Sequence, residues 1–124
     1  MAERPQHPGA DIVDAVRRIC LGLPEATEKP FGGHASPAFR VRDKLFLVIG
    51  EDGRSATCKA APGVQALLVA SDPERFFVPP YVGPKGWIGI RLDAGIDAGE
   101  LAELAEDSYR LVAPRRLSAL LDRP

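Results

Sequence analysis

Residues 36–60, SPAFRVRDKLFLVIGEDGRSATCKA, decide the fold class, because strand-forming segments follow one another here with only turns between them. There are three such segments: 36–41, 44–50 and 54–60. The pair Asp52–Gly53 is a strong signal for a type I′ hairpin, and Arg42–Asp43 fits a second tight turn. The stretch therefore predicts an antiparallel meander.

A helix is predicted on the N-terminal side of this meander. Asp11 fits an N-cap, and the apolar residues that follow recur at helical spacing. Gly22 and Pro24 end the pattern, which gives a helix over 11–22. A short strand near 27–31 is a further possibility before the meander begins.

Helices and strands alternate on the C-terminal side. Pro62 suits the first position of a short helix that Asp72–Pro73 stops. Strand signals return at 75–78 and 86–92. Asp97 with Glu100 resembles a capping box, and the helix that it starts ends before Pro114. A last basic turn or short helix follows at 115–121.

The order α-β-β-β-α-β-β-α, joined by hairpins, predicts an α+β fold with an antiparallel sheet and helices packed on one face. The other face of the sheet then stays at least partly in water. Residues 1–9 are predicted to form a flexible leader, and residues 10–124 a single domain, because no repeat or linker interrupts them.

Composition excludes several classes of protein. The 124 residues carry a formal net charge of −1, unlike a histone-like chain or an acidic disordered tail. No apolar run approaches the roughly 20 residues that span a bilayer, and the N-terminus lacks the apolar core of a signal peptide. The two cysteines lie 38 positions apart and form no framework. We therefore expect a cytoplasmic protein without a membrane partner.

The predicted open face of the sheet is basic. If the aliphatic residues of each strand face the helices, alternation leaves Arg40, Arg42, Trp87 and Arg91 on the open face, with Lys44 and Lys85 at its margins. The orientation of segment 54–60 stays ambiguous. Residues 29–91 carry a local charge of +4, whereas residues 93–109 hold six acidic residues and no basic one.

A basic, partly aromatic strand face is typical of several nucleic-acid-binding modules. Solvated sheet faces also carry Arg and Lys for solubility and to protect edges, and this plainer interpretation is the more frequent one. A single Trp at such a position is more often packed under a loop, here 79–86 (PPYVGPKG), than exposed. The acidic 97–107 segment fits a solvated helix surface better than a metal site.

No constellation for catalysis or metal binding stands out. His7 and His34 have no ligand partners at zinc-site spacing, and a loop His such as His34 more often bonds backbone than acts as acid or base. Cys20 fits the core, Cys58 lies in a strand, and nothing marks either as a nucleophile. We expect no enzyme activity, no catalytic residue and no cofactor.

Four blocks in order resemble the MmcQ/YjbR family of small bacterial proteins: LPEATEKPFGGHASPAFRV, KLFLVIGEDG, PPYVGPKGWIGIRL and EDSYRLVAPRRL. They run from about Leu21 to Leu117. The resemblance implies a CyaY-like α+β fold and DNA binding of the double-wing type. It supplies no catalytic residues.

The leading hypothesis is therefore non-catalytic DNA binding by a monomer or weak dimer. Its candidate contacts are Arg40, Arg42, Lys44, Lys85, Arg91, Arg115 and Arg116 for phosphates and Trp87 for stacking. An alternative is a protein-interaction or regulatory adaptor that uses the same face. Frataxin-like metal binding is a weaker alternative, because helix 11–22 offers only Asp11 and Asp14 beside Arg17 and Arg18.

Overall fold

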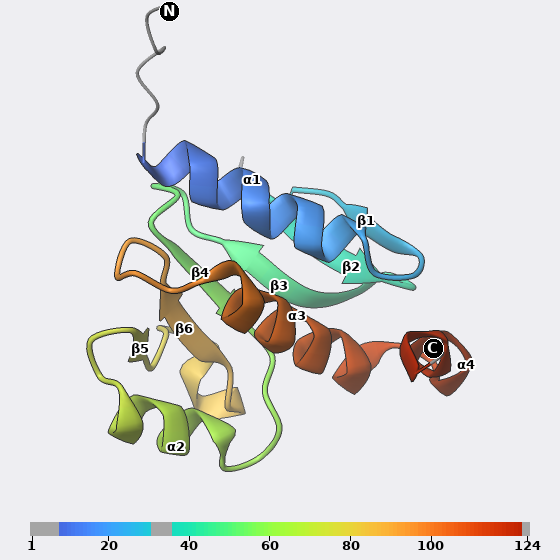
Figure 1. Cartoon of the computed structure of the whole chain (residues 1–124). Helices are drawn as coiled ribbons and strands as arrows, with labels where there is room; N and C mark the ends of the chain where they lie inside the picture. Colours follow the sequence, from blue (N-terminus) through green and yellow to red (C-terminus); the bar gives the residue numbers. More distant parts are fainter. Residues whose placement is uncertain (1–7, 31–35, 123–124) are drawn as a thin grey trace, which may run out of the picture.

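The computed structural model describes residues 8–30 and 36–122 of the chain (Figure 1). Its elements are, in order, α1 (Pro8–Leu21), β1 (Ala26–Glu28), β2 (Ala38–Val41), β3 (Lys44–Ile49), β4 (Ser55–Cys58), α2 (Val64–Ser71), β5 (Phe76–Phe77), the 3₁₀ helix η1 (Gly83–Lys85), β6 (Ile88–Arg91), α3 (Ala98–Val112), α4 (Arg115–Ser118) and the 3₁₀ helix η2 (Ala119–Asp122). No helix in the described residues is long and apolar enough to cross a membrane.

The six strands form one antiparallel sheet in the order β1-β2-β3-β4-β6-β5. Helices α1 and α3 lie against each other and cover one face, with α3 packed on β3 (Figure 1). The predicted α+β class and antiparallel sheet are confirmed. The optional strand near 27–31 is present as β1, at the edge of the sheet.

The core lies between this sheet face and the two long helices. Helix α3 buries one stripe, and that stripe comprises Leu101, Ala105, Ser108 and Tyr109. The predicted N-cap of this helix is confirmed, because the backbone N–H of Glu100 donates to Asp97 Oδ1 at 2.8 Å. The helix ends at Val112, before Pro114, as expected.

A β-bulge in strand β3 turns an extra aromatic residue toward the helices. Phe39 is opposite Leu47, but its neighbour Arg40 is opposite Leu45, so Phe46 is the extra residue. Both Phe46 and Leu47 are therefore buried in the core. The ring of Phe46 meets Tyr109 of α3 edge to face, with centroids 5.8 Å apart.

The two hairpin turns differ from the prediction. Arg42 and Asp43 have φ of 51° and 69°, the positive values that a type I′ turn requires at both central residues. In the other hairpin only Gly53 has positive φ, at 72°, and its N–H donates to Gly50 O. Asp52 instead accepts a hydrogen bond from Arg54 N–H at 2.9 Å. The type I′ prediction for Asp52–Gly53 is therefore wrong, since Asp52 lacks the positive φ and the loop between Gly50 and Ser55 has four residues, 51–54.

The positive φ of Asp43 in the Arg42–Asp43 turn is expected to lower the stability of the protein. Asp43→Gly is expected to stabilise the protein by about 0.5–1 kcal/mol, because glycine reaches positive φ without steric cost. The lost ion pair to Lys29 is long (3.8 Å) and exposed, so it contributes little. Asp52→Gly is the matched control and should destabilise, since it removes the bond to Arg54 N–H. Urea denaturation measures both; a destabilised Asp43→Gly would contradict the argument.

Two helix boundaries also differ from the prediction. Helix α1 begins at Pro8, within the predicted leader, while residues 1–7 lie outside the described residues. Helix α2 begins at Val64 rather than at Pro62, because Gly63 adopts a left-handed φ of 88° as its N-cap. The predictions for His7 and His34 fall outside the described residues.

Candidate functional site

The face of the sheet opposite α1 and α3 holds the candidate site. Strand pairing aligns one row of residues across this face: Ala38, Val48, Thr57, Gly89 and Phe77. A groove of about 320 Å³ runs over it, and we call this the open-face groove; its lining includes Leu45, Val48, Thr57, Phe77, Tyr81 and Trp87. The predicted open face exists, and its centre is apolar and aromatic rather than basic.

Basic residues flank this apolar centre. Arg40 is half-buried on β2, and its Nε is buried with no hydrogen-bond partner. Ala56 and Cys58 face the core, which resolves the orientation of β4 and places Lys59 on the open side by alternation. The N–H of Lys59 donates to Phe46 O, so it continues the β3–β4 ladder beside Leu45. Lys59 was not among the candidate contacts predicted from the sequence. Its alternation with Ser55 and Thr57 along the strand was the signal that could have identified it.

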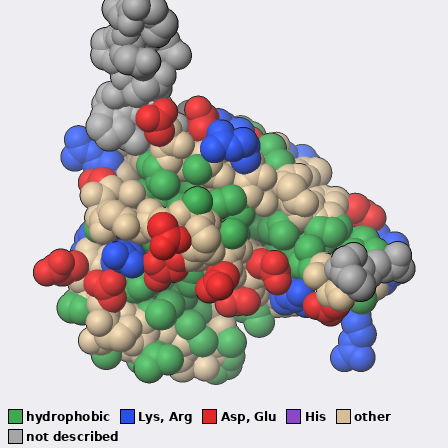
Figure 2. Space-filling view, viewed as in Figure 1, with side chains coloured by type: hydrophobic (Ala, Val, Ile, Leu, Met, Phe, Trp, Pro, Cys, Tyr) green, Lys and Arg blue, Asp and Glu red, His purple; other side chains and the backbone are tan. Residues whose placement is uncertain are grey.

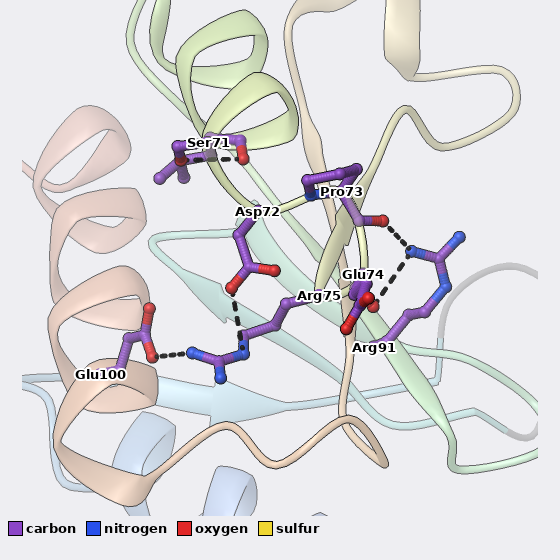
Figure 3. Close-up of polar contacts among 8 residues, drawn as sticks. Ser71, Asp72, Pro73, Glu74, Arg75, Arg91 and Glu100 are labelled. Atoms are coloured by element: carbon purple, nitrogen blue, oxygen red, sulfur yellow. Dashed lines mark hydrogen bonds and ion pairs between the residues drawn. The ribbon is translucent and has the colours of Figure 1, made fainter.

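Arg91 lies on the open face, at the end of the sheet formed by β6 and β5. Its side chain already makes contacts within the protein (Figure 3). Its Nη1 donates to Pro73 O at 3.1 Å, and its guanidinium lies 4.7 Å from the centroid of the Phe77 ring. Arg91 and Arg40 are three strand positions apart across the sheet, and they lie toward opposite ends of the aligned row, since Arg91 is opposite Ser55 and Arg40 is opposite Leu45. The two arginines therefore do not lie next to each other.

Trp87 lies immediately before β6 and is 9% exposed. It lines the open-face groove together with Pro79 and Val82, so its predicted place under the 79–86 loop is confirmed. Gln65 of α2 fixes this loop, because its Nε2 donates to Gly83 O at 2.9 Å and to Trp87 O at 2.7 Å. The wall of the groove is thereby held by a side chain from α2.

Tyr81 of the same loop is 94% exposed, the highest value among the large hydrophobic side chains of the described residues. Its φ is 67°, a left-handed conformation that costs an aromatic residue free energy. A second depression of about 690 Å³ adjoins the groove and shares Val48, Ser55, Pro80 and Tyr81 with it. Tyr81 therefore stands at the border of both hollows.

The remaining predicted contacts do not lie on the open face. Strand β2 ends at Val41, so Arg42 lies in the turn, where its Nε donates to Glu25 Oε1 at 2.7 Å. That hydrogen bond lowers the pKa of Glu25, and the charge of Arg116 on α4 adds a smaller effect in the same direction. The prediction that Arg42 shares the open face is wrong, because strand β2 ends at Val41 and Arg42 already belongs to the turn.

The other predicted cations lie on β3, η1 and α4. Lys44 pairs with core-facing Val41 at the start of β3 and is exposed. Lys85 is exposed in η1, two residues before Trp87. Arg115 and Arg116 are exposed on α4, beyond the end of α3. The cations thus form two groups, one around the open-face groove and one near the β2–β3 turn and α4.

The helix-covered face has the opposite charge. Figure 2 shows this face, where acidic side chains gather over the region of α3. They include Glu100, which accepts from Arg75 Nη1 at 2.8 Å, and Glu106, which pairs with Arg110 at 3.1 Å. Arg75 also pairs with Asp72 and so joins the end of α2 to the start of α3 (Figure 3). The sheet therefore separates an acidic helix face from a face flanked by cations.

Both cysteines are buried and free. Burial raises the pKa of the Cys58 thiol to about 11, and burial likewise raises the pKa of Cys20. Cys58 borders a cavity of about 250 Å³ under α3, beside Ser108, whose hydroxyl donates to Lys59 O at 2.5 Å. Raised pKa values leave both thiols protonated at neutral pH, so neither is an activated nucleophile.

Within residues 8–30 and 36–122, no group of three or more His, Cys, Asp or Glu side chains is placed to hold a metal ion. Of the two acids on α1 that the sequence singled out, Asp14 pairs with Arg17 at 3.2 Å. Arg17 also pairs with Glu28 of β1 at 2.9 Å.

Fold and surface together define a small α+β domain with one helix-covered and one open sheet face. The profile of the family described as YjbR matches residues 21–111, so the chain belongs to the YjbR family. This confirms the resemblance drawn from the four sequence blocks.

A solved relative agrees on the fold. The crystal structure of Deinococcus radiodurans protein DR2400, with a DUF419 domain, is similar at a TM-score of 0.74 and 23% identity. The similarity covers 90% of this chain and 88% of that chain. No curated protein matches the chain.

Proposed function

We propose that this YjbR-family protein binds DNA through the open face of its sheet and catalyses no reaction on it. The observation that carries the proposal is the combination of cations and aromatic rings on one face. Arg40 of β2 and Arg91 of β6 lie on the open face, alternation along β4 places Lys59 on the same face, and Trp87 and Tyr81 line the open-face groove. Phosphates on cations and bases on rings are the two contacts that nucleic-acid-binding sheets use.

The unsatisfied Nε of Arg40 supports a phosphate contact by this side chain. A buried guanidinium donor without an acceptor costs free energy, and a rotation of the side chain toward a phosphate oxygen would remove this cost with a charge-assisted bond. The proposal therefore centres on Arg40, Lys59, Lys85 and Arg91. Arg42, Lys44, Arg115 and Arg116 are assigned only to the outer phosphates of a longer strand.

A protein partner is the second candidate, and the apolar centre of the groove favours it. Leu45, Val48 and Phe77 are all half-buried there and would pack against apolar side chains of a partner. Salt separates the two candidates. Phosphate binding weakens steeply with salt, whereas an apolar interface changes little.

The test is a fluorescence-anisotropy titration of labelled DNA with the full chain, at about 50 and 200 mM salt. The variant Arg40→Ala/Lys59→Ala removes two predicted contacts, so the slope of log K against log salt should become shallower by roughly 1.5. Arg18→Ala is the control for changing an exposed arginine, since Arg18 lies on α1 beyond the opposite face.

A folded protein that binds no DNA at low salt would overturn the proposal and favour the protein partner. Equal salt slopes for the double variant and for Arg18→Ala would overturn the assignment of this face. Arg42→Ala should behave like the control with a short oligonucleotide, because Arg42 lies in the turn and pairs with Glu25.

A further inference from the structure

We infer that the DNA ligand is single-stranded and that one unpaired base enters the open-face groove. This inference rests on the proposed function and narrows its substrate class. It is carried by three features of the groove that phosphate binding alone does not need: recessed rings, free hydroxyl groups and a strained aromatic residue at the rim.

The rings of the groove are recessed. Trp87 is 9% exposed and Phe77 is half-buried, so only a thin flat group can reach them. Phe77 lies directly over Gly89, where a Cβ atom would come within 2.4 Å of its ring. The missing side chain at Gly89 is what lets Phe77 lie low and leaves the hollow of about 320 Å³ above the sheet.

The floor of the groove offers hydrogen bonds that the protein does not use. Ser55 and Thr57 of β4 line it, and neither hydroxyl bonds to another residue in the described part of the chain. A hydroxyl can both donate and accept, so this pair suits the polar edge of a nucleobase without selecting one base. A purely apolar peptide side chain would leave both groups unsatisfied.

The backbone conformation of Tyr81 is strained, and its side chain makes too little contact with the protein to compensate for that strain. The side chain is 94% exposed at φ 67°, and its hydroxyl has no partner among the described residues. Strain of this kind persists at binding sites, where the residue is held ready for a ligand. From the rim, Tyr81 is placed to stack on the base that enters or on its neighbour.

A duplex does not fit this arrangement. Its base faces are covered by stacked neighbours, so only phosphates and groove edges would meet the sheet, and the recessed Trp87 would stay without contact. A single strand exposes its base faces, and stacking on aromatic side chains is the sequence-tolerant way to bind them. The groove therefore selects strand type rather than sequence.

The experiment compares three labelled probes of equal length with the full chain: a thymidine oligonucleotide, a duplex, and an abasic single strand that keeps its phosphates. We expect the thymidine strand to bind at least tenfold more tightly than either other probe. Trp87 is the only tryptophan, so its fluorescence should change with the thymidine strand and stay constant with the abasic one. Tyr81→Ala should weaken thymidine binding about 5- to 150-fold, and Tyr81→Phe should preserve it.

The experiment distinguishes a failure of the single-strand inference from a failure of DNA binding as a whole. Equal affinity for all three probes would overturn the single-strand inference and leave DNA binding through phosphates intact. Binding to none of them by a folded protein would overturn the inference and the proposed function together. A Tyr81→Ala protein that loses nothing with the thymidine strand would also overturn the inference, and Tyr81 is too exposed for that variant to disturb folding.

Discussion

Tyr109→Ala is expected to lower the free energy of unfolding by about 3–5 kcal/mol. Tyr109 is fully buried, its ring meets Phe46, and its hydroxyl donates to Pro24 O at 2.8 Å. The substitution leaves a cavity between α3 and β3 and an unsatisfied carbonyl beside it. Chemical denaturation followed by circular dichroism measures the change.

The chain offers a matched control in its other tyrosine. Tyr81→Ala makes the same substitution at a side chain that is 94% exposed, and it should change stability by less than about 0.5 kcal/mol. Tyr109→Phe should lower the free energy of unfolding by about 1–2 kcal/mol, a value between those of the two alanine variants, because only the hydrogen bond disappears. Similar losses for both alanine variants would contradict the core role of Tyr109.

Gly89→Ala is expected to destabilise by about 1–3 kcal/mol and to disturb the open-face groove. A Cβ atom at position 89 would approach three atoms of the Phe77 ring to 2.4–2.6 Å. The ring must move, and its contact with the Arg91 guanidinium then breaks. Denaturation curves report the stability, and Trp87 fluorescence reports the groove.

A double-mutant cycle isolates the cause. In a Phe77→Ala background the same Gly89→Ala change should cost less than about 0.5 kcal/mol, since no ring remains to be displaced. Additive effects of the two substitutions would show that the cost comes from the sheet backbone and not from the ring.

Short-range patterns predicted the elements well. Alternation found β2, β3 and β4, and the Asp97–Glu100 spacing found the start of α3. Each of these signals depends on neighbours within a few residues, which a sequence displays directly.

The errors arose in turn geometry and in strand register. The hairpin at Asp52–Gly53 carries the type I′ signal, yet its four-residue loop, 51–54, has positive φ only at Gly53, and the type I′ turn forms at Arg42–Asp43. The bulge at Phe46 depends on how β3 pairs with β2. Pairing between strands is not visible in either strand alone.

The candidate site was predicted only in part. Arg40, Trp87 and Arg91 do share the open face, and Lys85 lies beside it. Lys59 was missed because the orientation of β4 depends on which of its two faces meets α3. The contribution of Phe77 to the groove was missed because this residue comes from an edge strand, and β5 pairs with β6 only in the assembled sheet.

The two outermost strands have a consequence for how the protein behaves in concentrated solution. Strand β1 has three residues and β5 has two, and prolines follow them closely at Pro30 and at Pro79–Pro80. Short edges interrupted by proline offer few free backbone groups to an incoming chain. We therefore expect edge-to-edge addition of a second copy to be unfavourable, so that the sheet stays at six strands in concentrated solution.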